Sequence, residues 1–278
     1  MKSMDAIPRD DQRGRPAVVC LHCSGSSGRQ WAHLAGRSGA DALVLAPNLL
    51  GYDDALPWPV ERRLAIDDEV DALAPLLDAL PGGVHLVGHS YGAAVALQLA
   101  LRRTASVRSL TLYEPVRFGL LLGSADPAAQ AVGRSIVAAG RAIGDRVLHD
   151  DPHGAGERFI DYWSGRGSWA AMSARQREAV AVRMPKVRAE FEALFADAVP
   201  LAAYRRLRMP VHLMVGADTL DPPREVARLL ATAIPGVHVS VLDGLDHMGP
   251  VLRPDAVLSA MQPFLRGAFG AETMREAA

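Results

Sequence analysis

The pentapeptide at positions 88–92 reads Gly-His-Ser-Tyr-Gly, so a serine stands between two glycines. It follows an apolar run at residues 84–87 and precedes a segment rich in Ala and Leu. The pattern Gly-x-Ser-x-Gly between a strand and a helix is typical of a sharp turn that exposes a nucleophilic serine. The residues two positions away must be small so that strand and helix can approach each other, as Gly88 and Gly92 are. The sequence therefore predicts that Ser90 is an activated nucleophile.

A serine hydroxyl needs a neighbouring base, which is most often a histidine. His247 lies in a loop just after the last apolar run, at residues 237–242, and can therefore reach the carboxyl-terminal edge of a sheet. His89 directly precedes Ser90, where its ring would point away from the position of the base. Three other histidines lie within predicted strands: His85, His212 and His238. We expect His247 to be the base.

Three carboxylates are candidates for the group that orients this base. Asp218 follows the apolar run at residues 211–215, and the chain order serine, aspartate, histidine is the expected one for a serine placed this way. Glu114 ends the preceding run and could also approach the histidine. Asp221 is followed by two prolines and fits a helix cap better. We favour Asp218 and keep Glu114 as the alternative acid.

The elements that must position these residues are short apolar runs that alternate with helical patterns. Helical spacing is clearest over residues 62–80 and again from the Ser90 turn to Arg102. Continuous apolar strands separated by helices indicate a mostly parallel sheet with helices on both faces, an α/β fold. The predicted strands cover residues 16–21, 42–46, 84–87, 107–113, 211–215 and 237–242.

The interval at residues 116–208 contains no convincing strand and is helix-like throughout. We expect it to be an all-helical cap, inserted into an α/β core formed by residues 1–115 and 209–278, over the sheet edge where ligands bind. A purely structural appendage is the alternative. Its aromatic residues could line an apolar pocket or fill the core of the insertion: Phe159, Tyr162, Trp163, Trp169, Phe191 and Phe195.

Composition limits the partners. A chain of 278 residues with 49% hydrophobic residues can bury a core without disulfides or a metal ion. The formal net charge of −1 and the absence of a basic run give no reason to expect nucleic acid or an anionic membrane. Residues 1–15 are polar, unlike a secretion signal, and no apolar run is long enough to span a membrane, so we expect a cytoplasmic protein that acts on a small molecule.

The sequence gives little indication of a cofactor or a metal site. Cys20 and Cys23 form a Cys-x-x-Cys pattern, which we interpret as two ordinary thiols at the end of a strand. His149 and His153 flank two aspartates, but no third ligand is in view, and a solvated loop is the expected structure. We therefore predict no metal and no cofactor. The sequence does not indicate the oligomeric state.

Residues 21–31, 88–92, 216–223 and 246–247 together resemble the α/β-hydrolase superfamily, and the resemblance covers most of the chain. Residues 22–31 are similar to the oxyanion loop of the family, which usually reads His-Gly-x with a tryptophan further on. By this resemblance, the backbone N–H groups of Ser24 and Tyr91 would hold the oxyanion. Cys23 stands where the family usually has glycine.

The resemblance also bears on the acid. The family commonly reads Gly-x-x-Asp at the loop after residue 215, but here Asp218 is one residue closer to Gly216 and Thr219 occupies the usual position. Some members have the acid after the strand that residues 110–113 resemble, which keeps Glu114 as a candidate. The first two strands of the full fold are expected to be missing or reduced, because about 15 residues precede the first clear strand.

The implied function is that of a serine hydrolase that cleaves a small carboxylic ester, lactone or thioester through an acyl-enzyme. Serine at position 90 argues against the epoxide hydrolases and haloalkane dehalogenases of the family, which use an aspartate nucleophile. Two alternatives remain open. One is a carbon–carbon bond hydrolase with the same triad, and the other is a non-catalytic small-molecule binding protein on this scaffold.

Overall fold

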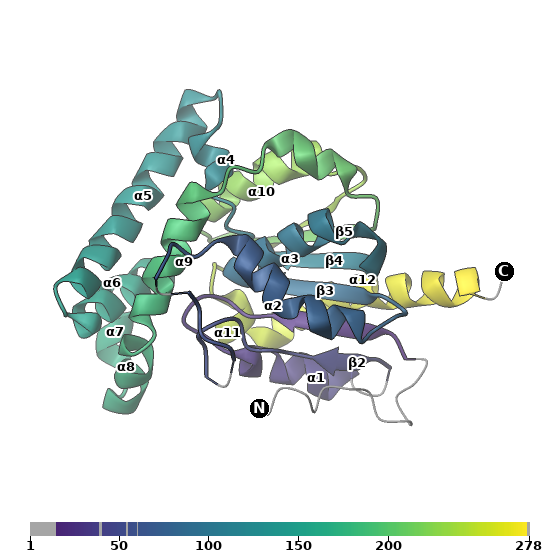
Figure 1. The fold of residues 1–278 in the computed structure, drawn as a ribbon, viewed down its shortest axis with the longest axis horizontal. Helices are drawn as coiled ribbons and strands as arrows, with labels where there is room; N and C mark the ends of the chain where they lie inside the picture. The colour runs from purple at the N-terminus through teal and green to yellow at the C-terminus, as the bar shows by residue number, and fades with distance from the viewer. Residues whose placement is uncertain (1–14, 39–40, 54, 60, 277–278) are drawn as a thin grey trace.

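The computed structural model describes residues 15–38, 41–53, 55–59 and 61–276. Residues 1–14, on which the expectation of no secretion signal depends, lie outside this part of the chain. The described residues form one six-stranded sheet with the order β2-β1-β3-β4-β5-β6, and all neighbouring pairs are parallel (Figure 1). The strands are β1 (Ala17–Leu21), β2 (Leu43–Leu45), β3 (Val84–His89), β4 (Val107–Tyr113), β5 (Val211–Gly216) and β6 (His238–Leu242). All six predicted strands are present, and among the described residues none precedes β1.

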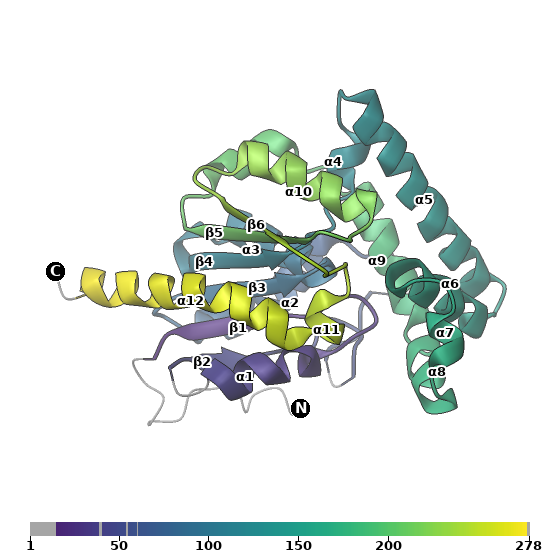
Figure 2. The same ribbon diagram turned by 180° about the vertical axis from the view of Figure 1, so that it is seen from behind.

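Helices cover both faces of this sheet, as the continuous apolar strands predicted. Alternate residues of each strand point to opposite faces, so that Val19 of β1 packs in one core cluster and Val18 in the other. The first cluster includes α2 (Ile66–Asp78), α3 (Tyr91–Arg102) and α10 (Asp221–Ala233). The second lies beneath α1 (Ala32–Ser38), which follows the short helix η3 (Gly28–Trp31), and α12 (Pro254–Glu276) (Figure 2).

Between β4 and β5 the described chain contains helices only, and they project to one side of the sheet (Figure 1). The interval is helix-like as expected, and its residues 173–198 contain a break. The chain forms two helices there, because Pro185 lies in the first turn of the second, where its missing N–H is harmless. The segment consists of α4 (Gly119–Leu122), α5 (Pro127–Leu148), α6 (Pro152–Ser164), α7 (Ser168–Ala171), α8 (Ala174–Ala181), α9 (Met184–Ala196) and η5 (Leu201–Arg206). No described helix is long and apolar enough to cross a membrane.

A buried ion pair joins the beginning and the end of this helical segment. Arg117 is fully buried, and its guanidinium group contacts the Asp197 carboxylate at 2.8 and 2.9 Å. The same guanidinium donates to the Gln98 side chain at 3.1 Å and to the carbonyl oxygen of Ala94 at 3.3 Å, both on α3. The two ends of the segment are therefore held together and fixed to the helix that follows Ser90.

We expect Arg117→Met to lower the free energy of unfolding by about 3–5 kcal/mol, because it leaves the Asp197 carboxylate buried without its cation. Urea unfolding followed by circular dichroism measures the change. Arg102→Met is the matched control, since Arg102 forms solvent-exposed ion pairs with Asp67 and Asp71 that water screens. Equal losses in the two variants would contradict the proposed role of burial.

Candidate active site

Ser90 is the single residue between β3 and α3, and its backbone is strained. Its φ of 55° and ψ of −116° lie outside the regions that L-residues with side chains prefer. Two hydrogen bonds hold this conformation: its N–H donates to the carbonyl oxygen of Tyr113 at 3.0 Å, and its carbonyl accepts from the N–H of Ala94 at 3.0 Å. The predicted strand–turn–helix context of the serine is thus present.

The two glycines of the pentapeptide are required by close packing. A Cβ atom at position 88 would lie 2.6 Å from Cα of Ala93, and one at position 92 would lie 2.3 Å from the carbonyl oxygen of Leu21. Neither neighbour is a flexible side-chain end, so any larger residue would push the strand and the helix apart. The glycines therefore allow β3 and α3 to approach closely enough to form the turn.

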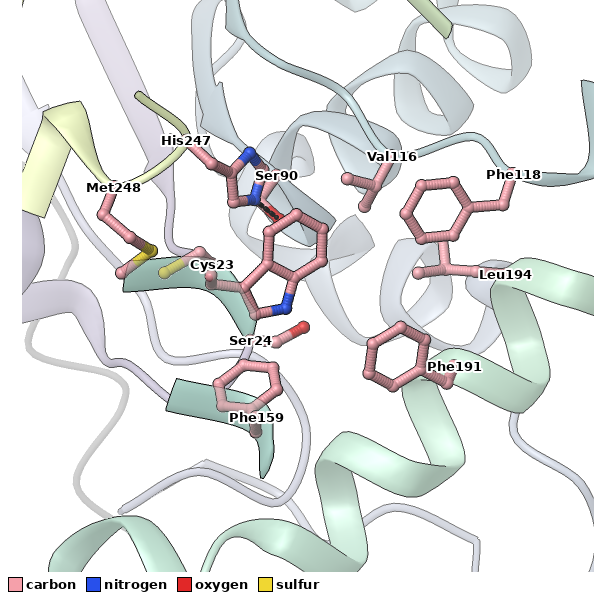
Figure 3. Close-up of a pocket in the computed structure, with 11 residues that line it drawn as sticks. Cys23, Ser24, Ser90, Val116, Phe118, Phe159, Phe191, Leu194, His247 and Met248 are labelled. Atoms are coloured by element: carbon pink, nitrogen blue, oxygen red, sulfur yellow. Dashed lines mark hydrogen bonds between the residues drawn. The ribbon is translucent and has the colours of Figure 1, made fainter. Parts of the chain in front are cut away.

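His247 approaches Ser90 from the loop between β6 and α11 (Gly249–Leu252). Its Nε2 lies 2.9 Å from Oγ of Ser90, the contact drawn as a dashed line in Figure 3. Both side chains are buried, with exposed fractions of 3% and 6%. In this geometry the serine hydroxyl donates to the imidazole, which is the arrangement needed for proton removal by a base. The sequence-predicted nucleophile and base therefore lie in contact.

The carboxylate that contacts His247 belongs to Glu114. Oε2 of Glu114 lies 2.7 Å from Nδ1 of His247 and also accepts a 2.6 Å hydrogen bond from the Thr219 hydroxyl. Its other oxygen accepts from the N–H of Gly216 at 2.7 Å. Glu114 directly follows β4, has a positive φ of 45° and is fully buried. The His247 ring, the Thr219 hydroxyl and the Gly216 N–H thus surround the Glu114 carboxyl group.

Asp218, which the sequence favoured as the acid, does not occupy this position. Its side chain is exposed, and its backbone N–H donates to the carbonyl oxygen of Leu245 at 2.9 Å. The residue of this loop that faces the site is Thr219, whose hydroxyl binds Glu114. The turn of this loop brings Thr219, rather than Asp218, toward the site. The Asp218 side chain is therefore exposed, and Glu114, the alternative acid, contacts His247 instead. Asp221 is the first residue of α10 and not its cap as expected: the N-cap position is occupied by Leu220, and no side-chain capping hydrogen bond forms there.

The backbone N–H groups of Ser24 and Tyr91 have no acceptor within the described part of the chain. Tyr91 is the first residue of α3, so its N–H is one of the unpaired donors of a helix N-terminus. On either side of Ser24 the N–H groups are occupied: that of Cys23 donates to Oε1 of Gln30 at 3.1 Å, and that of Gly25 donates to the Tyr52 hydroxyl at 2.9 Å. The geometry leaves Ser24 and Tyr91 available for an oxyanion.

His89 and Gln30 support the loop of the candidate base, and the sequence analysis missed both roles. Nε2 of His89 lies 2.8 Å from the carbonyl oxygen of His247, and its Nδ1 lies 3.0 Å from the amide nitrogen of Gln30. Burial lowers the pKa of His89 well below its ordinary value, so the ring is neutral. Gln30 then donates to Nδ1, and Nε2–H donates to the His247 carbonyl. No local pattern marks Gln30, because its partners are distant in the sequence.

A mostly apolar pocket opens above the serine (Figure 3). It contains about 380 Å³ of empty space, part of which is continuous with solvent. Trp163 stacks on His247 with ring centroids 4.1 Å apart and an interplanar angle of 30°, which narrows the space beside the serine. Of the aromatic residues for which the sequence left pocket lining and core packing both open, Phe159, Trp163 and Phe191 line the pocket. Its other lining residues are Cys23, Ser24, Ser90, Val116, Phe118, Leu194, His247 and Met248.

The remaining aromatic residues pack within the helical segment. Tyr162 meets Trp163 edge-on, Trp169 packs against Gly156, and Phe195 lies beside Phe191. These three residues therefore fit the other expectation, that such aromatic residues fill the core of the insertion.

Cys20 and Cys23 are free, buried thiols. Burial raises the pKa of Cys23 to about 12, so it stays protonated beside the pocket. His153 pairs with Glu178 at 3.0 Å, and His149 contacts the backbone carbonyl of Asp145. Within the described residues, no group of three or more His, Cys, Asp or Glu side chains is placed to hold a metal ion.

The sheet, the strained serine turn and the histidine loop define an α/β hydrolase. The model of the alpha/beta hydrolase family matches residues 18–260, and the chain belongs to this family. A pimeloyl-[acyl-carrier protein] methyl ester esterase of Aromatoleum aromaticum is 26% identical over 266 residues, which cover 91% of this chain and 99% of that protein. Lipase LipV of Mycobacterium tuberculosis is 38% identical over 110 residues, and this match spans 39% of the chain and only 41% of the lipase.

Solved structures show the same fold. The enol-lactonase from Burkholderia xenovorans LB400 superimposes with a TM-score of 0.71 at 18% identity, covering 91% of this chain and 92% of that one. The predicted fold, a mostly parallel sheet with helices on both faces and helical residues inserted between two strands, is therefore confirmed.

We expect Glu114→Gln to lower kcat/KM by about 10³- to 10⁴-fold, because an amide can hold the imidazole in the wrong tautomer and cannot stabilise its positive charge. Asp218→Asn should leave kcat/KM close to that of the unchanged protein, since the Asp218 side chain points to solvent. Initial rates with a p-nitrophenyl acyl ester measure both. The reverse ranking would restore Asp218 as the acid.

Proposed function

We propose that this chain is a serine hydrolase that cleaves a small, uncharged carboxylic ester, or a related lactone or thioester, through an acyl-enzyme. The observation that supports it most is the continuous contact from Ser90 to His247 at 2.9 Å and on to Glu114 at 2.7 Å, at the floor of an apolar pocket. Residues 1–115 and 209–278 form the core in this proposal, and residues 116–208 are a cap over the pocket.

Acylation follows from this geometry. Nε2 of His247 accepts the proton of the Ser90 hydroxyl as the oxygen attacks the carbonyl carbon of the ester. Glu114 holds the Nδ1–H tautomer and stabilises the imidazolium that forms. The negative charge on the former carbonyl oxygen is received by the N–H groups of Ser24 and Tyr91. The imidazolium then gives its proton to the departing alcohol, and the acyl group remains on the serine oxygen.

Hydrolysis of the acyl-enzyme completes the cycle, with water as the attacking group and the serine oxygen as the leaving group. His247 accepts a proton from a water molecule, and the resulting hydroxide attacks the acyl carbon. The tetrahedral intermediate is again held by the two backbone N–H groups. When it collapses, the bond to the serine oxygen breaks and His247 returns the proton to that oxygen. A free carboxylic acid leaves, and Ser90 is regenerated.

The pocket favours a neutral, apolar acyl group. Among the residues that the structure describes, those lining the pocket include no lysine, arginine or carboxylate, so a charged acyl chain would be buried without a partner. Phe159, Phe191 and Leu194 offer apolar surface, while the stacked Trp163 restricts the space next to the serine. A relative named as a lipase and another named as a methyl ester esterase agree with ester cleavage. A carbon–carbon bond hydrolase, the alternative function, would bind a diketone acid. The described residues that line the pocket include no lysine or arginine that could pair with its carboxylate.

Ser90→Ala should abolish turnover of a p-nitrophenyl ester, because the attacking oxygen is removed. A fluorophosphonate should label the unchanged protein once per chain, at Ser90, and should not label this variant; mass spectrometry measures the adduct. Undiminished turnover by Ser90→Ala would overturn the proposal. Ligand binding without any labelling of Ser90 would instead support the non-catalytic binding protein.

A panel of esters tests the substrate class. We expect kcat/KM for p-nitrophenyl butyrate to exceed that for the corresponding succinate half-ester by at least about 100-fold, because a buried, unpaired carboxylate costs several kcal/mol. Lactones and a ring-cleavage diketone acid complete the panel, with product release measured by absorbance. Preference for the succinate or for the diketone acid would contradict the assignment of a neutral ester.

A further inference from the structure

A buried lysine on the cap lies behind the candidate oxyanion hole. Lys186 of α9 has an exposed fraction of 1%, and its Nζ donates to Oε1 of Glu69 at 2.9 Å and to Oε1 of Glu190 at 2.8 Å. Glu69 belongs to α2 of the core, whereas Glu190 is one turn along α9. Burying three charged groups is expensive, and apolar residues of similar volume would often stabilise the fold equally well.

One branch of contacts leads from Lys186 to the loop that contains Ser24. Oε2 of Glu190 accepts a 3.0 Å hydrogen bond from the Tyr52 hydroxyl. The same hydroxyl accepts the N–H of Gly25 at 2.9 Å, the residue directly after Ser24. This hydrogen bond fixes the loop directly beside Ser24, which lines the pocket.

A second branch leads to Tyr91, whose backbone N–H is the other candidate donor to the oxyanion. Its side-chain hydroxyl donates to Oε1 of Glu69 at 3.3 Å, the oxygen that also binds Lys186. The lysine ammonium group further lies 5.2 Å from the ring centroid of Tyr52 and 5.1 Å from that of Tyr91, within cation–π distance of both. Both branches, one to the loop of Ser24 and one to Tyr91, therefore start from the ammonium group of Lys186.

The protonation states keep these contacts intact. Burial opposes the charge of Lys186, but the carboxylates of Glu190 and Glu69 raise its pKa above the ordinary value. Burial and the nearby carboxylates raise the pKa of Tyr52 and of Tyr91 well above the ordinary value. The lysine remains a cation and the two phenols remain donors.

We propose that Lys186 is a positioning residue, which sets the spacing of the Ser24 and Tyr91 N–H groups through Tyr52 and through the Tyr91 side chain. This inference rests on the proposed function. None of the side chains in the two branches lines the pocket, so they act through the backbone donors rather than on the substrate. Lys186 belongs to the cap, whereas both donors belong to the core. The two N–H groups therefore have the spacing needed to bind the oxyanion only when the cap is correctly packed on the core.

Lys186→Met tests the inference with a side chain of similar length. We expect kcat for a p-nitrophenyl ester to fall by about 10- to 100-fold, because the two donors lose their fixed spacing. KM should change by less than about threefold, since the pocket lining is untouched. Arg188→Met is the matched control on the same helix: Arg188 pairs with Glu192 at the surface, and its loss should leave kcat unchanged.

Tyr52→Phe removes a single oxygen and carries the test if Lys186→Met does not fold. It should also lower kcat with little change in KM. In the double variant the two losses should not multiply, because both substitutions interrupt the same branch. Affinity for an apolar trifluoromethyl ketone, which forms an oxyanion with Ser90, should fall by the same factor as kcat in each variant.

The outcomes separate this inference from the proposed function. Unchanged kcat in Lys186→Met and Tyr52→Phe, losses that multiply in the double variant, or losses confined to KM would each overturn the role of Lys186 alone. Absence of Ser90-dependent turnover and of a ketone adduct in the unchanged protein would overturn the proposed function, and the inference with it.

Discussion

The strained turn at Ser90 is the constraint on which the rest of the site depends. A serine with a φ of 55° persists only where its surroundings hold it, and here β3, α3 and the backbone of Tyr113 do so. The close approach of strand and helix at Gly88 and Gly92 makes the turn possible. As a result the hydroxyl and the free N–H groups at the start of α3 point to the same edge of the sheet.

A parallel sheet explains why distant residues gather at this edge. The carboxyl ends of β3, β4, β5 and β6 lie side by side, so the loops that follow them can contact one another. Glu114 follows β4, Thr219 lies beyond β5 and His247 beyond β6, and together with Ser90 they form one hydrogen-bonded set. Each group has a partner supplied by the loop of a neighbouring strand, and this partner fixes its orientation.

The helical segment contributes in two different ways. Four of its side chains line the pocket: Phe159, Trp163, Phe191 and Leu194. Its buried charges connect it to the core, through the pair of Arg117 and Asp197 and through the pair of Lys186 with Glu69 of α2. Buried ion pairs add little stability compared with apolar packing, but they fix geometry because a displaced charge would be left without a partner. Such contacts hold the helical segment in one position relative to the sheet.

The sequence by itself determined the six strands, the serine turn and the histidine loop. These features depend on local patterns: apolar runs, glycines at fixed offsets and the position of a loop after a strand.

Only the tertiary structure decided which carboxylate meets His247. Asp218 and Glu114 both follow strands at the correct edge, and the choice depends on where each loop turns relative to its neighbour. The contacts of Gln30 with His89 and of Lys186 with Glu69 were likewise not predictable, because these partners are far apart in the sequence. Local patterns specify elements and the residues at their ends, whereas the pairing of side chains from different loops is fixed only when those loops are packed together.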